Sequence, residues 1–538
     1  MTQQSALQTS KYIKPAREEK LFYKAAVFFL FSLFVMPQYF GIPTPLFDFT
    51  LLRMALILVF FMIIYDDERK NAFADMVLHS KLTLILVPYV LVLLYTMVLR
   101  ADINAFLNPF LEIFSFYLLI YVIRDYLGVE KTLKCILVFL YLLTILGIIE
   151  YVMGRSPFSY LETIKGIYTG RFVRSGNYRI MSSCNHSLGY GLLLVAVTPI
   201  ACLDYQKNEI SLLRRPVLFL LLLINVFLTG SRSTLSVFIV EAVLIFILSS
   251  RVNKKKCILG GSVLIAGLAI FLVVFYRTKI AQYILLQFAS IIDSVLGTQY
   301  SNIFGGSIEA LGSSSNYRDQ LKYIFKVDWL NPFLGIGRKR SFASEINGSF
   351  IESIDNFYIA EYVRYAYPGL ITYGFFLICY LGGMIKKCLT DKAVYKVLMT
   401  GMACYMLNLL WVDSLQTLKY MYILIAIYIC QQKNDNKVIT FSDAVNRYLK
   451  TKRITQADLI RKSQLTRTTV SRICRNSNDK GSSYQSTDRV VMSICVALEL
   501  NHTETAEMFA LAFPYFPYWH EIIEKRIDIF QANALLDE

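Results

Sequence analysis

Between residues 21 and 431 the chain alternates long apolar runs with short charged loops. A helix that crosses a bilayer needs about 20 mostly apolar residues, and a window of about 19 residues finds such runs. The pattern predicts an all-α, polytopic membrane helix bundle with about twelve spans. The predicted spans are 21–42, 46–65, 82–99, 105–123, 133–153, 185–203, 216–230, 232–250, 257–276, 366–385, 394–412 and 414–431.

The loops between these runs alternate in charge, and this predicts the orientation of the bundle. Lys and Arg crowd one set of loops, whereas the alternate short loops at 43–45, 100–104 and 412–413 hold almost none. Cytoplasmic loops carry the basic excess, so we expect an inner-membrane protein with both termini, including residues 1–20, in the cytoplasm. Two long outer loops follow, 154–184 and 277–365. The first run lacks a small-residue cleavage site, so no cleaved signal peptide is expected.

Two helices are predicted inside the larger outer loop. Residues 280–296 are apolar but interrupted by polar positions, which favours a helix lying on the membrane surface. A second helix should run through 316–330 and stop before Asn331-Pro332, because the residue before a proline disfavours helical geometry. Gly335-Ile336-Gly337 then predicts a turn.

After Cys430 the composition changes to that of a soluble domain. Residues 432–437 form a polar linker, and 438–538 should be cytoplasmic because they follow the last span. The charge of this tail is uneven. Residues 437–489 hold twelve Lys and Arg against four Asp and Glu, whereas residues 499–538 hold two against eight.

The overall composition agrees with a chain that lives in lipid. Of 538 residues, 55% are hydrophobic and 17% are charged, with a mean hydropathy of +0.47; soluble domains are roughly 25% charged. Disorder, a collagen-like fibre and a secreted disulfide scaffold are excluded. The ten Cys form no CxxC pair and the four His are scattered, so we expect neither a metal site nor a cofactor.

Basic residues in the outer loops depart from the charge pattern. Loop 154–184 holds five against the single acid Glu162, and Arg232 stands in a tight turn between two apolar runs. Arg makes bidentate, charge-assisted contacts with phosphate, which suits a lipid pyrophosphate at the membrane surface. The alternative is contact with lipid head groups. The outer Arg residues are Arg155, Arg171, Arg174, Arg179, Arg232, Arg318, Arg338 and Arg340.

Four stretches follow one another in a recognisable order. They are RIMSSCNHSLGYGLLL at 179–194, LTGSRSTL at 228–235, NYRDQLKYIFKVDWLNPFLGIG at 316–337 and DNFYIAEYVRYAYPGLITYGFF at 355–376. Together they resemble the O-antigen ligase and polymerase family of bacterial envelope polysaccharide synthesis. The resemblance implies metal-independent, inverting transfer of a glycan from undecaprenyl pyrophosphate to a sugar hydroxyl.

The resemblance also implies roles for single residues. Arg179 and Arg232 would bind the donor pyrophosphate and stabilise the charge that builds up on it, as fixed cations can. Arg318 would assist them or orient the acceptor. Ligases of the family carry a His where this chain has Asp355. Asp355 could act as the general base for the acceptor hydroxyl, and the change favours a polymerase over a ligase. The alternative role for Asp355 is the N-cap of the following helix.

Three acids lie in or beside predicted spans: Glu112, Glu150 and Glu241. Charges at such depth are costly and usually face the interior of a bundle. We therefore expect structural or cavity-lining roles for them.

Residues 455–475 of the tail read as a helix, a tight turn and a second helix. Apolar residues recur there with the spacing of an inward face, and the stretch resembles the Cro/lambda-repressor type of helix-turn-helix. Residues 466–475 would be the recognition helix, with further helices at about 487–499 and 503–512. Gln464 departs from the pattern, since the turn usually has Gly, and so does Ile460, where a small residue is usual. The residues implied in contacts with duplex DNA are Gln456, Thr466, Arg467, Thr468, Ser471 and Arg472.

Two functional classes remain open from the sequence. The first is a membrane glycosyltransferase, a polysaccharide polymerase or a ligase, that binds an undecaprenyl-linked glycan and membrane lipid. The second is a membrane-anchored transcription regulator whose tail binds DNA. The tail could also be a bundle that binds a cytoplasmic protein. About twelve spans and a group of external Arg residues exceed what an anchor needs, so the sequence favours the enzyme.

Overall fold

The structure is a computed structural model. It describes residues 16–44, 48–168, 170, 173–174, 177–304, 318, 320–346, 348–390, 392–436, 441–452, 454–474 and 487–513. The chain divides into two compact units, Met1–Gln431 and Gln432–Glu538, and the described residues of both are mostly helical.

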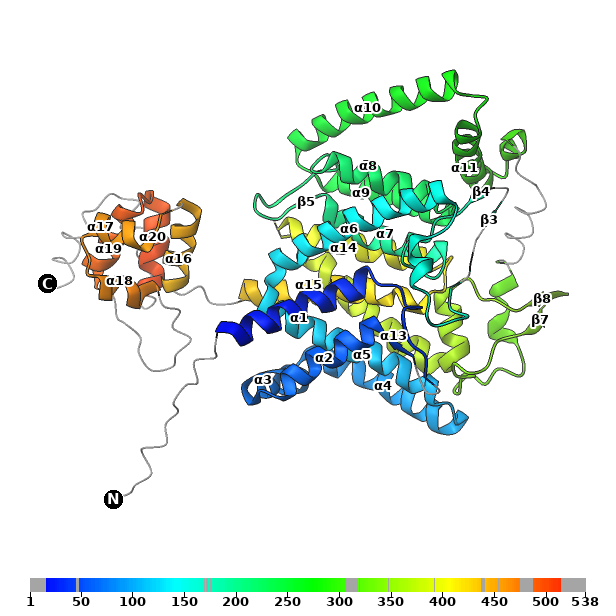
Figure 1. The fold of residues 1–538 in the computed structure, drawn as a ribbon, viewed down its shortest axis with the longest axis horizontal. Helices are drawn as coiled ribbons and strands as arrows, with labels where there is room; N and C mark the ends of the chain where they lie inside the picture. Colours follow the sequence, from blue (N-terminus) through cyan, green and yellow to red (C-terminus); the bar gives the residue numbers. More distant parts are fainter. Residues whose placement is uncertain are drawn as a thin grey trace. The chain divides into compact units, whose positions relative to one another are not determined.

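Long helices build the first unit (Figure 1). In chain order they are α1 (Ala16–Phe34), α2 (Leu51–Ile64), α3 (Asp67–Leu78), α4 (Lys81–Arg100), α5 (Ile103–Val122), α6 (Gly128–Met153), α7 (Ser187–Ala201), α8 (Pro216–Leu228), α9 (Arg232–Leu248), α10 (Arg251–Val274), α11 (Lys279–Leu296), α13 (Phe357–Cys388), α14 (Ala393–Asn408) and α15 (Leu418–Asn436). A π-helix, η1 (Ile123–Leu127), joins α5 to α6 without a break.

Several of the apolar helices begin at a residue whose side chain accepts the first free backbone N–H groups. Thr50, Ser80 and Asp102 cap α2, α4 and α5 in this way. Each of the predicted spans coincides with a helix. Among the described residues, however, four helical segments are both long and apolar enough to cross a bilayer: Lys81–Arg100, Ile103–Met153, Arg251–Val274 and Phe357–Cys388. The apolar helices α2, α7 and α8 are shorter. The structure thus supports a membrane protein, and the count of about twelve spans stays a prediction.

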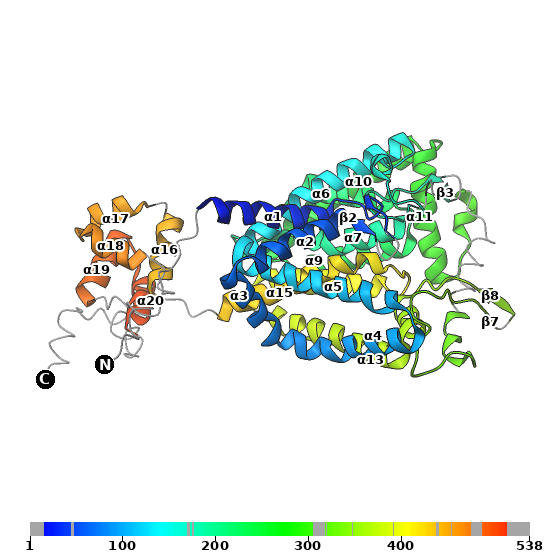
Figure 2. The ribbon, with the colours of Figure 1, turned by 60° about the horizontal axis from the view of Figure 1, so that its bottom comes forward.

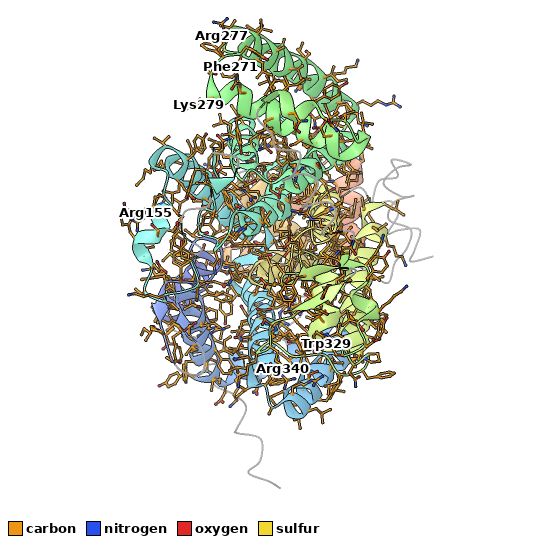
Figure 3. The ribbon with its side chains drawn as sticks, turned by 90° about the vertical axis from the view of Figure 1, so that its right-hand side faces the viewer. Arg155, Phe271, Arg277, Lys279, Trp329 and Arg340 are labelled. Atoms are coloured by element: carbon orange, nitrogen blue, oxygen red, sulfur yellow. The ribbon has the colours of Figure 1, made fainter. Side chains whose placement is uncertain are left out.

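The loops predicted to lie outside gather at one end of the first unit. In both Figure 1 and Figure 2, α11 and the hairpins β3–β4 (Val173–Arg174, Asn177–Tyr178) and β7–β8 (Ser344–Ile346, Ser349–Ile351) share that end. Figure 3 looks onto it and places Arg155, Arg277 and Arg340 there. Two further hairpins are β1–β2 (Gly41–Ile42, Phe49–Thr50) and β5–β6 (Leu203–Asp204, Glu209–Ile210), and all four are antiparallel.

The large loop differs in part from its prediction. The first predicted helix, 280–296, is confirmed as α11. The second is wrong in length: residues 318 and 320–321 are helical, a turn follows, and a short 3-10 helix, η4 (Ile324–Lys326), ends well before Asn331-Pro332. Other 3-10 turns are η2 (Pro157–Leu161), η3 (Tyr300–Phe304) and η5 (Leu415–Thr417). The predicted linker is also partly wrong, because α15 continues as a helix to Asn436.

The second unit contains α16 (Phe441–Lys452), α17 (Gln456–Ser463), α18 (Arg467–Cys474), α19 (Asp488–Ala497) and α20 (His502–Ala512). The predicted helices are confirmed, and α16 is an additional one. These helices bury a hydrophobic core of their own that includes Val445, Leu459, Val470 and Phe509. Gln464, which ends α17, adopts left-handed geometry with φ 57°, so the turn keeps the conformation for which Gly is preferred.

Candidate active site

Arg179 packs against the turn that carries Arg232. Its Nε donates a hydrogen bond to the carbonyl of Thr229 at 2.6 Å, and the side chain is 3% exposed. Gly230 is needed at this place, because it has φ +59° and an added Cβ would lie 3.1 Å from Cγ of Arg179. Arg232 is the first residue of α9, directly after the N-cap Ser231. The structure therefore brings the two predicted Arg residues to one helix N-terminus, where free N–H groups favour anions.

Glu150 of α6 holds the segment that carries Arg179. One oxygen of its carboxylate accepts from the backbone N–H of Met181 at 2.8 Å and from the hydroxyl of Tyr178 at 2.9 Å. The other accepts from the N–H of Ser182 at 2.7 Å. Glu150 is fully buried, so its role is structural, as expected for an acid in a span.

Replacing Glu150 by Gln should loosen this segment and lower both stability and activity. The amide nitrogen of Gln cannot accept a hydrogen bond, so the N–H of Ser182 or of Met181 loses its acceptor inside the protein, at a cost of about 1–3 kcal/mol. The melting temperature of the purified protein should fall. Glu130→Gln is a matched control, because Glu130 pairs with Lys134 at the surface. Equal melting temperatures for the two variants would contradict this role.

The Gly-Ile-Gly turn fits against a kink in α13. Pro368 cannot donate a backbone hydrogen bond to the carbonyl of Arg364, and Ala366 is non-helical with φ 56°. The freed carbonyl of Arg364 instead accepts from the N–H of Gly337 at 3.0 Å. At Gly335 an added Cβ would lie 2.1 Å from that same carbonyl, so only Gly permits the contact.

Arg100, the last residue of α4, and Asp102, the N-cap of α5, fix the other side of this turn. Arg100 donates to the carbonyls of Gly335 and Leu334, at 2.7 and 3.0 Å. The carboxylate of Asp102 accepts from the N–H groups of Arg338 and Lys339, at 2.7 and 2.8 Å. The chain after Gly337 is therefore held in place, which positions the Arg338 side chain beside the ring of Tyr365.

Asp355 precedes α13, but it does not cap the helix. Asn356 is the N-cap and accepts from the N–H of Ile359 at 3.1 Å, so the proposed capping role of Asp355 is wrong. The side chain of Asp355 instead accepts a long hydrogen bond, 3.4 Å, from Ser353. This leaves the carboxylate of Asp355 directed into a cavity that it helps to line.

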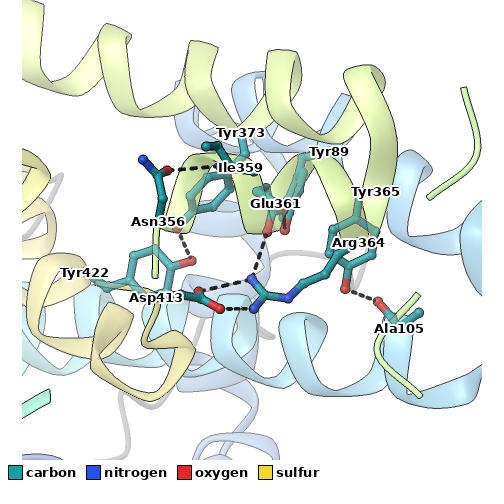
Figure 4. A network of polar contacts seen from close by, with 10 residues as sticks. All are labelled: Tyr89, Ala105, Asn356, Ile359, Glu361, Arg364, Tyr365, Tyr373, Asp413 and Tyr422. Carbon is teal, nitrogen blue, oxygen red and sulfur yellow. Dashed lines mark hydrogen bonds and ion pairs between the residues drawn. The ribbon is translucent and has the colours of Figure 1, made fainter. Parts of the chain in front are cut away.

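Arg364 and Asp413 line the same cavity as Asp355. Figure 4 shows that the two side chains form a paired contact. The two terminal nitrogens of the guanidinium group, Nη1 and Nη2, donate to the two carboxylate oxygens of Asp413, one at 3.2 Å and the other closer. Burial raises the pKa of Asp413, and the charge of Arg364 opposes that shift. Glu361 adds a longer ion pair to Arg364 at 4.0 Å and accepts from Tyr89 at 2.6 Å, which ties α13 to α4.

We call the space in front of Asp355 the outer cavity. It has a volume of about 730 Å³ and is walled by α2, α5, the loop after Gly337, and α13. Its charged side chains balance, since four are basic and four are acidic. They are Arg53, Arg338, Arg340, Arg364, Asp48, Glu352, Asp355 and Asp413.

A second space, the inner cavity, adjoins the first and has a volume of about 570 Å³. The two share lining residues, among them Arg53, Arg338, Arg364 and Asp413. The inner cavity extends to His186, which is the N-cap of α7. His186 is close enough to Arg179 to interact with its charge. The two cavities together thus run from the neighbourhood of Arg179 to Asp355.

The predicted catalytic residues therefore form two groups. Arg232 follows the turn before α9, Arg179 packs against that turn, and neither lines a cavity described above, whereas Asp355 lines the outer one. Arg318 is half-buried within the described residues, and its Nε is buried without a hydrogen-bond partner there. Arg171 lies outside the described residues. Glu241 is fully buried in α9 among apolar neighbours, and Glu112 lines the inner cavity.

Sequence reasoning missed several residues that shape these cavities. Three of them are charged residues in or beside apolar runs: Arg53, Asp413 and Lys419. A single charge in such a run indicates a residue that faces a cavity or a functional site. Arg100 and Asp102 belong to residues 100–104, a loop from which the sequence predicted only the orientation of the bundle. Their contacts with residues about 235 positions away leave no local trace in the sequence.

In the second unit, the predicted DNA-contacting residues are all at least partly exposed. Gln456, Thr466, Arg467, Thr468 and Arg472 are exposed and Ser471 is half-exposed, whereas Val470 and Ile473 face the core. Thr466 accepts from the N–H of Thr469 and so caps α18. Part of the basic stretch, residues 475–486, lies outside the described residues.

The comparisons with known proteins give one family match. The family model of the O-antigen ligases matches residues 217–374, which include the turn with Arg232, the large loop and the start of α13 with its kink. No curated protein matches the chain. The family match and the apolar helices indicate a membrane protein, and they support an enzyme of glycan processing with glycosyltransferase-like activity of the O-antigen ligase and polymerase type.

Proposed function

We propose that the protein is a polymerase of an envelope polysaccharide that works at the outer face of the cytoplasmic membrane. The observation that carries the proposal is the pair of adjoining polar cavities between the Arg179–Arg232 turn and Asp355. The donor is a glycan on undecaprenyl pyrophosphate, and the acceptor is a hydroxyl group of a second glycan. Both chain termini lie in the cytoplasm.

In this proposal the donor pyrophosphate binds at the N-terminus of α9. Arg232 supplies a bidentate contact, and the backbone N–H groups of the first turn add to it. Arg179 fixes the turn through Thr229 and adds its charge to the site. Arg318 is a further phosphate ligand or orients the acceptor.

Asp355 is the general base of the reaction. The acceptor oxygen attacks the anomeric carbon of the donor as its proton passes to Asp355. The bond between the anomeric carbon and the pyrophosphate oxygen breaks, and its electron pair leaves with the pyrophosphate. Attack from the opposite side inverts the configuration. The Arg residues stabilise the leaving group without need of a metal ion.

Polymerase and ligase differ in the acceptor, so product analysis separates them. The purified protein is incubated with an undecaprenyl-pyrophosphate glycan as the sole substrate. A polymerase should produce a ladder of longer lipid-linked glycans and free undecaprenyl pyrophosphate. A ligase needs a different acceptor and should leave this donor unextended, which would contradict the proposed polymerase.

We propose as a second function that residues 438–538 bind duplex DNA through α18. The exposed surface with Arg467, Thr468 and Arg472, and the basic charge of residues 437–489, support this. A protein partner in the cytoplasm is the alternative occupant of the same surface. A membrane-anchored transcription regulator would need DNA binding alone, whereas a polymerase with a regulatory tail would need both glycosyl transfer and DNA binding.

The DNA proposal predicts salt-dependent binding by the isolated second unit, residues 432–538, which has its own core. Its affinity for duplex DNA should fall by about tenfold or more between 50 and 200 mM salt, since Lys and Arg contacts release counterions. Arg467→Ala should weaken binding, whereas Arg447→Ala, which removes a partner of Glu507, is the control. Fluorescence anisotropy should be measured with the unit alone and fused to a dimerising helix. If DNA binding is absent or independent of salt in both formats, the DNA proposal is contradicted, and a cytoplasmic protein becomes the expected partner of this surface.

A further inference from the structure

The inner cavity holds polar side chains that the fold itself does not use. They come from α5, from the segment before α7 and from the segment around η5 and α15, and include Glu112, Ser115, Ser183, Gln416 and Lys419. Polar groups inside a membrane domain are costly and mark functional positions. The cavity is therefore a candidate for a ligand of its own.

Glu112 of α5 and Lys419 of α15 both line this cavity and attract each other electrostatically. Neither makes a hydrogen bond or an ion pair with another residue in the part of the chain that the structure describes. Lys419 lies only over the ring of Tyr420, with 5.1 Å from its Nζ to the centroid. A carboxylate and an ammonium group thus line one cavity, and no described residue uses their hydrogen-bonding capacity.

Ser183 provides an independent observation on another wall. It is 5% exposed, lines the cavity, and its hydroxyl oxygen is buried with no partner among the described residues. Arg338 lines both cavities, and its Nε is likewise buried with no hydrogen-bond partner among the described residues. Buried polar atoms of this kind are rare unless a ligand or water satisfies them.

The chemistry of the walls selects among possible ligands. The cavity is lined by charged groups of both signs, with Glu112 and Asp413 beside Arg338 and Lys419, so it suits a polar ligand, whereas a lipid tail would leave these charges unsatisfied. A sugar ring suits the site, because each hydroxyl group can donate to a carboxylate and accept from an ammonium group. Aromatic side chains complete the fit: Phe116 and Tyr422 line the cavity and stack with 4.9 Å between ring centroids. The volume of about 570 Å³ leaves room for a ring with its substituents.

We infer that the inner cavity binds the sugar that is joined to the donor pyrophosphate, and that Glu112 and Lys419 determine which sugar is accepted. The inference rests on the proposed function and adds a specificity site to it. The cavity reaches His186, on which the charge of Arg179 acts, and it shares Arg338 with the cavity of Asp355. The donor sugar thus lies between the leaving group and the acceptor, as transfer requires.

Binding can be tested apart from catalysis, with the full chain in lipid nanodiscs. Saturation-transfer NMR is recorded with the methyl glycosides of glucose, galactose and N-acetylglucosamine, and with inorganic pyrophosphate. We expect one or more of the sugars to bind. Glu112→Gln and Lys419→Gln should each weaken that binding by about tenfold or more, because a hydrogen bond to a charged group is lost. Pyrophosphate binding should persist in Glu112→Gln.

The controls separate this inference from the proposed function. Glu352→Gln changes an acid that lines the outer cavity alone, and Asp355→Asn removes the base, so both should bind the sugar normally. If Glu112→Gln lowers the melting temperature, Ser183→Ala serves as a milder variant, and it should also weaken sugar binding. The inference is overturned if none of the sugars binds, or if binding is unchanged in Glu112→Gln and Lys419→Gln. Polymer synthesis that persists in Asp355→Asn would instead overturn the proposed function and leave the sugar site intact.

Discussion

Replacing Asp355 by Asn should reduce polymer synthesis by about two to four orders of magnitude, which is the usual contribution of a general base. The variant keeps the shape of the side chain, and Asn356 still caps α13, so the helix should fold normally. The measurement is the rate of donor consumption by purified protein at equal amounts of folded enzyme. The melting temperature should stay within about 1 °C of the unaltered protein, since a half-exposed side chain with one long hydrogen bond contributes little to stability.

Glu352→Gln is the matched control for this variant. Glu352 stands three residues earlier, lines the same cavity and is more exposed than Asp355. It should retain nearly all activity. Equal activity of the Asp355 and Glu352 variants would show that Asp355 does not accept the proton, and the base would have to be sought among the other acids of the outer cavity.

The second large effect is expected from Asp413→Ala, which removes the close partner of Arg364 and leaves its longer ion pair with Glu361, at 4.0 Å. Removing one partner of a buried pair costs 3–5 kcal/mol. The side chains of Arg364 and Asp413 are 17% and 18% exposed, and solvent screening lowers our expectation to about 2–3 kcal/mol. The melting temperature in detergent should therefore fall clearly.

A double-mutant cycle isolates the pair from the surrounding packing. Arg364→Ala together with Asp413→Ala should recover part of the loss, because no unpaired charge remains. Activity should fall in all three variants, since both residues line both cavities. A double variant that is as unstable as the two single losses combined would argue that the two side chains act independently.

The helices of the fold could be predicted because they are encoded locally. Apolar runs predicted the positions of α1, α2, α4 to α11 and α13 to α15, whereas the polar helix α3 was not predicted. Inward-facing residues such as Leu459 and Val470 predicted α17 and α18. Boundaries were weaker. The polar residues after Cys430 predicted a linker, yet α15 continues to Asn436, since Gln, Lys and Asn prolong a helix that packing has already formed.

The site was harder to predict because its contacts are distant in sequence. Periodicity cannot show that Glu150 holds the Arg179 segment, or that Asp102 binds the N–H groups of Arg338 and Lys339. The capping prediction for Asp355 failed by one residue, since Asp355-Asn356 offers two good caps and the contact of Asn356 with the carbonyl of Leu410 favours the second. The order of the motifs identified Arg232 and Asp355 as candidates. The cavities that lie between these two residues could be found only in the structure.

The central claim is that the Arg232 turn and Asp355 serve one glycosyl transfer. The most direct test is to measure undecaprenyl pyrophosphate release and glycan elongation together, using purified protein and an undecaprenyl-pyrophosphate glycan. The unaltered chain should release one pyrophosphate lipid for each glycan joined. Arg232→Lys, which keeps the charge but loses the planar fork, and Asp355→Asn should each stop both products, whereas Arg155→Lys should stop neither. Full elongation by Arg232→Lys and by Asp355→Asn would contradict the account.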